Sequence, residues 1–192
     1  MSATDKLTES ISASAAAIAG LQAQTGAVAA AGAAIVKSLK AGGKVMTAGN
    51  GGSAAEALHM AEEFVGRFLG NRPSLAAVAL VADPTALTCI ANDFGYDYVF
   101  SRQVEGLGRS GDVLVLFSTS GRAANLQKAL QAARERAIVT ICLLGRDGGP
   151  LAGQADHEII VRSQSTARIQ EAHQVLVHLL LEVAEEAFGS AR

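Results

Sequence analysis

The stretch SGDVLVLFSTSG, residues 110–121, joins an apolar run to a loop of hydroxyl side chains. Residues 113–117 are all apolar and include two valines, which is typical of a strand covered on both faces of a parallel sheet. A Ser-Gly-Asp turn precedes the run, and Ser-Thr-Ser-Gly follows it. Open parallel sheets bind their ligands at the carboxyl ends of strands. The stretch therefore predicts a central strand with a candidate binding loop directly after it.

Similar apolar runs recur along the chain and alternate with helical patterns. Four further runs are expected to be strands: residues 44–48, 76–80, 138–144 and 157–161. Three segments carry a helical pattern: residues 53–69, 122–136 and 166–188. Strands separated by helices predict an α/β fold, a doubly wound five-stranded parallel sheet flanked by helices. We see no repeat or linker that divides the chain, so we expect one domain over residues 1–192 with an N-terminal helical extension.

That extension carries no charged residue between Glu9 and Lys37 and is rich in alanine. A membrane span is the alternative, but alanine is weakly lipophilic, and polar residues interrupt the run: Ser12, Ser14, Gln22, Gln24 and Thr25. A secretory signal needs a positive start, whereas Lys6 (+1), Asp5 (−1) and Glu9 (−1) sum to −1. We expect one or two alanine helices within residues 1–41, with the break at Gly20 and residues 22–26. So few charges indicate packing against other helices, and the segment is expected to form an oligomer interface.

The composition excludes several classes of protein. Hydrophobic residues make up 49% of the 192 residues and charged residues 18%, which supports a folded core and argues against a disordered chain. The net charge is −2, aromatic residues make up 4% and tryptophan is absent, so no nucleic-acid surface is expected. Cys89 and Cys142 lie in separate apolar stretches and offer neither a disulfide framework nor a CxxC metal pair. We expect a cytoplasmic protein with reduced thiols.

Two loops after expected strands carry groups that suit a phosphate. Gly49-Asn50-Gly51-Gly52-Ser53 would let the backbone approach a ligand closely, and Ser53 is expected to cap the following helix. The loop does not read GxGxxG and no Walker lysine follows it, which disfavours a nucleotide. A plain glycine turn is the alternative.

The second loop offers the hydroxyls of Ser118, Thr119 and Ser120 at the start of an expected helix, where the helix dipole favours an anion. An ordinary hydroxyl-rich turn is the alternative here too. The two loops together predict a sugar phosphate as the ligand, with Asn92 and Asp93 as candidate contacts to the sugar.

Two expected helices carry side chains of the kind that bind metals or transfer protons. His59 and Glu63 are four residues apart, so they share one helix face and can hold an ion or act as an acid–base pair. An exposed surface pair is the alternative, and Glu62 at the third position also faces His59. Gln170 and His178 lie eight residues apart in the C-terminal helix, which is about 12 Å along its axis. They can meet at one ion only if both reach inward or come from different subunits.

Six motifs follow one another along the chain: AGNGGSAAEALHMAEEF (48–64), NRP (71–73), ANDFGY (91–96), STSG (118–121), ARIQEAH (167–173) and His178. Their order resembles that of the SIS-domain sedoheptulose 7-phosphate isomerases, also called phosphoheptose isomerases. The resemblance implies a homotetramer with zinc-containing active sites between subunits. It also implies conversion of sedoheptulose 7-phosphate to D-glycero-D-manno-heptose 7-phosphate, the first step toward nucleotide-activated heptose for surface glycans such as lipopolysaccharide.

The resemblance also implies roles for individual residues. Zinc, one ion per subunit, would be bound by His59, Glu63, Gln170 and His178. Glu63 would be the base that moves a proton between C1 and C2 through an enediol, with His178 as its acid–base partner. The substrate would contact a larger set of residues: Gly49, Asn50, Gly51, Ser53, Glu63, Asn92, Asp93, Ser118, Thr119, Ser120 and Gln170.

The chain departs from the family pattern at Ala123, where the family often has another serine, separated from STSG by one residue. One lost hydrogen bond is worth about 0.5–1.5 kcal/mol, so we expect weaker substrate binding, with Arg122 as a candidate substitute. Two other functions are alternatives. One is a non-catalytic SIS module that binds phosphosugars and regulates a partner protein such as a replication initiator. The other is an isomerase of a different sugar phosphate.

Overall fold

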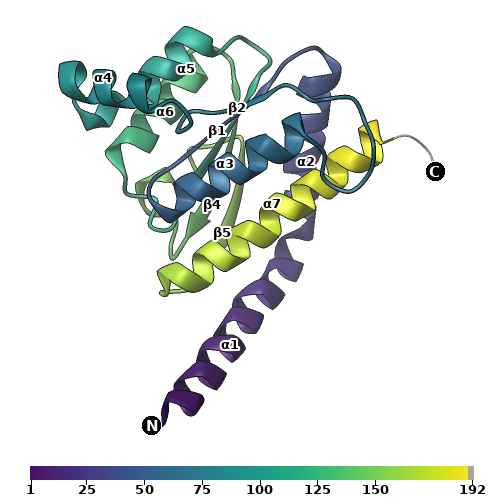
Figure 1. Cartoon of the computed structure of the whole chain (residues 1–192), viewed down its shortest axis with the longest axis vertical. Coiled ribbons are helices and arrows are strands. Elements are labelled where there is room, and N and C mark those ends of the chain that lie inside the picture. The colour runs from purple at the N-terminus through teal and green to yellow at the C-terminus, as the bar shows by residue number, and fades with distance from the viewer. Residues whose placement is uncertain (190–192) are drawn as a thin grey trace.

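A five-stranded parallel sheet forms the middle layer of the chain (Figure 1), as a computed structural model describes it for residues 1–189. The strands are β1 (Val45–Gly49), β2 (Ala77–Ala79), β3 (Val113–Ser118), β4 (Val139–Gly145) and β5 (His157–Val161). Their order in the sheet is β2-β1-β3-β4-β5, and every neighbouring pair is parallel. The predicted doubly wound parallel sheet is therefore confirmed, with the run at residues 113–117 in its central strand.

Helices cover both faces of the sheet because alternate strand residues point to opposite sides. Val113, Val115 and Phe117 pack into one apolar core with helices α2 (Thr25–Lys40), α3 (Gly52–Val65) and α7 (Thr166–Phe188). Leu114 and Leu116 pack into a second core on the other face. The helices there are α4 (Pro84–Phe94), α5 (Ser101–Leu107) and α6 (Ala124–Glu135). Within residues 1–189 there are also three short 3₁₀ turns: η1 (Gly20–Gln24), η2 (Tyr96–Tyr98) and η3 (Gly149–Leu151).

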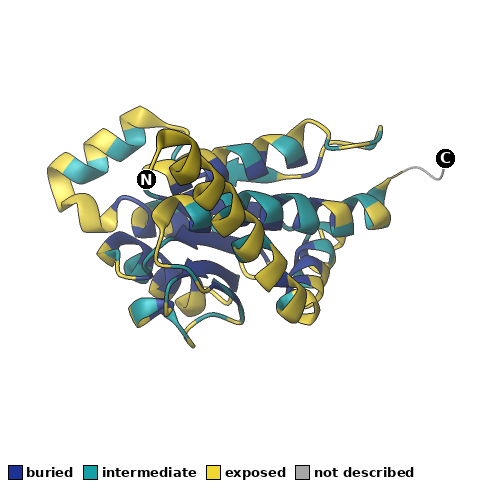
Figure 2. Cartoon of the chain, turned by 90° about the horizontal axis from the view of Figure 1, so that it is seen from below, coloured by how far each residue is buried: buried dark blue, intermediate teal, exposed yellow. Residues whose placement is uncertain are grey.

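The N-terminal helix α1 (Ala3–Ala19) extends away from the body of the molecule and is exposed along most of its length (Figures 1 and 2). Arg168 of α7 anchors it by donating to the Ser14 hydroxyl at 2.7 Å. The predicted break in the alanine-rich segment is confirmed, since η1 separates α1 from α2. Residues 3–40 are long and apolar enough to cross a membrane by length and composition. Within them, however, α2 places Val28, Ala31 and Ile35 in the core, as a packed helix of a folded domain does.

The turn η1 also contacts the outer strand of the sheet. The Gln24 side chain donates to the Ile160 carbonyl oxygen at 2.9 Å and accepts from the Ile160 N–H at 3.0 Å. A side-chain amide thereby occupies two main-chain groups at the exposed edge of β5.

Several boundaries and two helices differ from the prediction. The helix expected over residues 53–69 ends at Val65, and the helix expected from residue 122 begins at Ala124. Helix α4 was not predicted, although Asp83 caps it by accepting from the N–H groups of Thr85 and Ala86 at 2.8 and 3.1 Å. The dipeptide Asp-Pro at a helix start was the available signal. Helix α5 has only seven residues, too few to give a clear periodic pattern.

Both cysteines are free thiols, which agrees with the absence of a disulfide framework in the sequence. Burial inside β4, together with the nearby Glu158 carboxylate, raises the pKa of Cys142 to about 12. Cys142 is therefore an inert core residue, whereas Cys89 is exposed on α4.

The carboxylate of Asp156 ties the start of β5 to β4 and makes stability depend on pH. It accepts from the Thr140 N–H at 2.8 Å and from the Thr140 hydroxyl at 2.7 Å. Burial acts to raise the pKa of Asp156, but these hydrogen bonds and the nearby His157 and Arg134 hold it below the usual value. The unfolded chain therefore takes up this proton at a higher pH than the folded chain does.

We therefore expect the Asp156 carboxylate to stabilise the fold fully above the ordinary carboxyl pKa of about 3.9, and to lose that effect as pH falls through the lower folded value. Urea unfolding of the wild type and of Asp156→Asn at a series of pH values measures this. The difference in unfolding free energy should stay constant from neutral pH to about pH 5 and shrink below about pH 4. A difference that is the same at every pH would contradict the prediction.

Candidate active site

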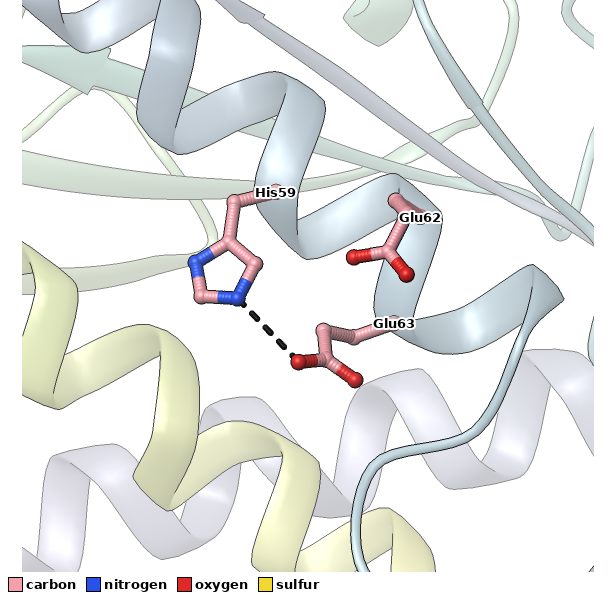
Figure 3. A group of neighbouring side chains, drawn as sticks. All are labelled: His59, Glu62 and Glu63. Atoms are coloured by element: carbon pink, nitrogen blue, oxygen red, sulfur yellow. Dashed lines mark hydrogen bonds and ion pairs between the residues drawn. The ribbon is translucent and has the colours of Figure 1, made fainter.

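One face of α3 carries an imidazole and two carboxylates (Figure 3). The His59 Nε2 and Glu63 Oε1 atoms are 3.1 Å apart, and one ligand atom each from His59, Glu62 and Glu63 lie within 4.8 Å of one another. His59 and Glu63 are partly buried, and Glu62 is exposed. The i, i+4 spacing seen in the sequence thus produces a hydrogen-bonded pair, as predicted.

Helix α7 brings a second imidazole to this pair. The His59 and His178 rings meet edge to face with centroids 5.5 Å apart, and Phe68 stacks on His178 at 5.5 Å. Between the two imidazoles lies the side-chain amide of Gln174, whose Nε2 is 2.7 Å from His59 Nδ1 and 3.2 Å from His178 Nε2. The structure therefore joins Glu63, His59, Gln174 and His178 in one hydrogen-bonded cluster. Gln174 was not predicted as a site residue, although its place four residues before His178 puts it on the same helix face.

The donor atoms of this cluster suit a metal ion such as zinc. Imidazole nitrogen and carboxylate oxygen are ordinary zinc ligands, and His59, Glu62 and Glu63 already offer both kinds at one place. His178 stands next to them.

Gln170, the remaining predicted ligand, is also on α7, but its side chain contacts the start of α3. Its amide packs against Gly52, at the start of α3, so closely that a Cβ on Gly52 would overlap it. Gly52 precedes His59 by seven residues, or about 10 Å along the helix. Within one chain Gln170 therefore joins the glycine loop and not the imidazole cluster, and its role as a metal ligand stays a prediction.

The glycine loop between β1 and α3 is held in place by side chains from outside it. Asn50 and Asn125 exchange two hydrogen bonds of 2.9 Å through their amides, and the Tyr96 hydroxyl donates to Asn50 Oδ1 at 2.9 Å. Asn125 is buried at the start of α6, so it fixes the loop to the rest of the fold. Neither Asn125 nor Tyr96 was predicted to belong to the site.

The expected capping role of Ser53 is wrong. The residue before the first turn of α3 is Gly51, with φ +60° and ψ −122°, a backbone conformation that favours glycine. Ser53 lies inside the first turn and is buried, 3% exposed. Gly49 is also required, because a Cβ there would overlap the main chain of Ser53.

The hydroxyl loop after β3 closes on itself. The Ser118 hydroxyl accepts from the Gly121 N–H at 2.9 Å, and the Ser120 hydroxyl accepts from the Arg122 N–H at 3.3 Å. Gly121 has φ +62°, and a Cβ there would overlap the Gly148 carbonyl oxygen. These bonds give the loop one fixed shape, and each hydroxyl keeps its O–H hydrogen and one of its two lone pairs for a further partner.

Two other predicted features lie in the surface of the single chain. Asn92 and Asp93, in the last turn of α4, are exposed and bonded to each other at 2.8 Å. Ala123 occupies the N-cap of α6 and provides no side-chain cap, while the Arg122 guanidinium lies 3.5 Å from the Asp147 carboxylate. The roles of these residues toward a substrate stay predictions.

Known proteins resemble this chain over almost its whole length. The SIS domain family model matches residues 9–145. A phosphoheptose isomerase of Vibrio vulnificus (strain CMCP6) is 50% identical over 153 residues, 79% of this chain and 80% of the relative. The chain belongs to the phosphoheptose isomerase family. The structure of a phosphoheptose isomerase from Neisseria gonorrhoeae is 43% identical and matches with a TM-score of 0.86 over 95% of this chain and 96% of that one. A phosphoheptose isomerase from Francisella tularensis is 33% identical, with a TM-score of 0.90 over 97% and 100%. As a member of this family the chain is a sugar-phosphate isomerase, and the resemblance drawn from its motifs is confirmed.

In this member of the phosphoheptose isomerase family, the buried Arg72 of the NRP motif stabilises the end of α3. Arg72 donates to the carbonyl oxygens of Glu63 and Phe64 at 2.6 and 2.9 Å and to the Glu185 carboxylate of α7 at 2.8 Å. Its side chain is 1% exposed. The bonds join the last turn of α3, which carries Glu63, to the helix that carries His178.

The third histidine of these two helices is a core residue. His173 is fully buried, 3.6 Å from the buried carboxylate of Glu56, and its ring meets Phe117 at 6.1 Å. It faces the sheet, so of the three histidines on α3 and α7 only His59 and His178 belong to the hydrogen-bonded cluster.

Proposed function

We propose that this isomerase converts D-sedoheptulose 7-phosphate to D-glycero-D-manno-heptose 7-phosphate through an enediol. The observation that carries the proposal is the cluster on α3 and α7. In it the Glu63 carboxylate contacts the His59 imidazole, and the His178 imidazole packs against His59. Aldose–ketose isomerisation needs a base beside the carbon-bound proton and a second group that moves a proton between the two oxygens. The cluster offers both.

In this mechanism the Glu63 carboxylate removes a proton from C1 of the ketose and returns it to C2. The Glu63 Oε1 atom lies 3.1 Å from His59 Nε2 on the same face of α3. The His178 imidazole exchanges the proton between the oxygens on C1 and C2, so no electron acceptor or second substrate is required. The glycine loop, Gln170 and the hydroxyls of the β3 loop would bind the phosphate and the sugar, together with Asn92 and Asp93.

Zinc, one ion per subunit, would be held by His59 and Glu63 with His178 and Gln170, and when bound it would stabilise negative charge on the substrate oxygens as a Lewis acid. Gln170 lies with the glycine loop of its own chain, and this supports an active site that two subunits share. We propose a homotetramer in which residues 1–41 form the oligomerisation segment. An apolar groove between η1, α2 and α7 supports this, lined by Leu21, Val28, Val175, Leu179 and Val183. The product would enter nucleotide-activated heptose synthesis in the cytoplasm, for a surface glycan such as lipopolysaccharide.

The test is to incubate the purified protein with sedoheptulose 7-phosphate in D₂O and to follow the sugar by NMR. We expect aldoheptose 7-phosphate to form with deuterium at C2. Treatment with a chelator should abolish turnover, and added Zn²⁺ should restore it.

Each other outcome has a definite meaning. Turnover that survives complete metal removal would contradict the zinc assignment but not the isomerisation. If no aldoheptose forms although the sugar still shifts the protein resonances, the chain is a phosphosugar-binding module or an isomerase of another sugar. The proposed reaction would then be wrong.

A further inference from the structure

We infer that Gln174 is a positioning residue that sets which nitrogen of His59, and which nitrogen of His178, is free to act. The inference deepens the proposed function and rests on it, because the two imidazoles belong to the proposed site. It starts from the position of one amide between two rings, 2.7 Å from His59 Nδ1 and 3.2 Å from His178 Nε2.

A neutral imidazole carries one N–H group, and its other nitrogen has a free lone pair. His59 Nε2 faces Glu63 Oε1 at 3.1 Å, so Nε2 is the nitrogen on the carboxylate side of the ring. An ion held between His59 and the Glu63 carboxylate would therefore use the lone pair of Nε2. The proton of His59 must then be on Nδ1, and Nδ1–H needs an acceptor.

The side-chain amide of Gln174 meets both requirements. With its NH₂ group toward the rings, it donates to His59 Nδ1 and to His178 Nε2, and His59 Nε2–H donates to Glu63. A rotation of 180° about the last side-chain bond exchanges the amide nitrogen and oxygen without altering the shape of the side chain. The oxygen then accepts from His59 Nδ1–H and His178 Nε2–H. This second orientation frees His59 Nε2 as a ligand and His178 Nδ1 as a proton acceptor.

The surroundings of Gln174 place its amide between the two rings. It is partly buried, and it lies one helical turn before His178, so the two side chains share a face of α7. Phe68 stacks on the His178 ring and holds it toward the amide. One amide therefore couples the tautomers of two imidazoles that come from different helices.

The test uses Zn²⁺ itself as the probe, with two variants and a control. Gln174→Leu removes both polar atoms, and Gln174→Glu keeps oxygen acceptors only. We expect Gln174→Leu to weaken Zn²⁺ binding about 10–100-fold in competition with a chromogenic chelator, and Gln174→Glu to retain or strengthen it. Gln131→Leu, an exposed glutamine on α6, should bind Zn²⁺ as the wild type does.

A second readout follows the tautomers directly and needs no activity. The chain has four histidines. Ring ¹⁵N–¹H correlation spectra of protein labelled with ¹⁵N-histidine can therefore be assigned with variants that each lack one histidine. In metal-free wild type we expect His59 to carry its proton on Nε2, and with Zn²⁺ on Nδ1. In Gln174→Leu the metal-free His59 and His178 signals should move toward those of a mixture of tautomers.

Unchanged Zn²⁺ affinity and unchanged ring ¹⁵N shifts in Gln174→Leu would overturn the inference while leaving the proposed function intact. If the wild type itself binds no Zn²⁺, the zinc assignment fails, and the metal-free spectra still decide whether Gln174 sets the tautomers. A drop in kcat for Gln174→Leu without any change in the spectra would also count against it.

Discussion

Replacing Glu63 with glutamine is expected to lower kcat about 10²–10⁴-fold, the usual contribution of a general base. Glutamine has nearly the same size and still forms a hydrogen bond with His59, so the geometry of the cluster is retained. It cannot accept a proton from carbon. Steady-state kinetics with sedoheptulose 7-phosphate, together with deuterium incorporation at C2, measure the loss, and both should fall together.

Glu62 provides a matched control, since Glu62→Gln makes the same chemical change one residue away. Glu62 is exposed on α3, whereas Glu63 makes the hydrogen bond with His59. We expect Glu62→Gln to keep kcat within a few-fold of the wild type. If Glu62→Gln lost activity and Glu63→Gln kept it, the two carboxylates would have exchanged roles and the proposed base would be wrong.

Replacing Arg72 with methionine is expected to lower the free energy of unfolding by about 3–5 kcal/mol, the cost of removing one partner of a buried ion pair. The guanidinium is 1% exposed and the Glu185 carboxylate 12% exposed. The variant leaves that carboxylate without its cation and takes the guanidinium donor from the Glu63 carbonyl oxygen, while the Phe64 carbonyl oxygen still accepts from the Leu75 N–H at 3.0 Å. Urea unfolding followed by circular dichroism measures the change.

Two comparisons make this prediction specific. Arg122→Met removes a similar pair at the surface, where Arg122 and Asp147 are 61% and 70% exposed, and should change stability by less than about 1 kcal/mol. The double variant Arg72→Met with Glu185→Met removes both buried charges and should regain part of the lost stability. An Arg72→Met protein as stable as Arg122→Met would show that the buried pair contributes nothing to the fold.

Local patterns in the sequence were sufficient to predict most of the sheet. Short apolar runs such as residues 113–117 become covered strands wherever helices lie on both sides, and Ser165 caps α7 directly before the expected start at residue 166. The break after Gly20 could be located because glycine and polar residues interrupt an alanine run. Each of these features depends on neighbours in the chain.

The contacts that build the site depend on residues far apart in the sequence, and these could not be predicted. The Asn50–Asn125 pair spans 75 residues, and the contact of Gln174 with His59 spans 115. The capping role expected of Ser53 failed because the unusual φ of Gly51 depends on how β1 enters the loop. Helical spacing placed His59 beside Glu63, but only the packing of α3 on α7 separates Gln170 from them.

The two edge strands of the sheet, β2 and β5, affect how readily the chain aggregates. One outer strand, β2, has only three residues, which is too short to template another strand. The other, β5, has its Ile160 main-chain groups occupied by the Gln24 amide, which acts as a single-residue substitute for a neighbouring strand. Both edges of the sheet are therefore poor templates for strand pairing between molecules. The chains can associate through their helices without forming the intermolecular strand pairs that lead to amyloid.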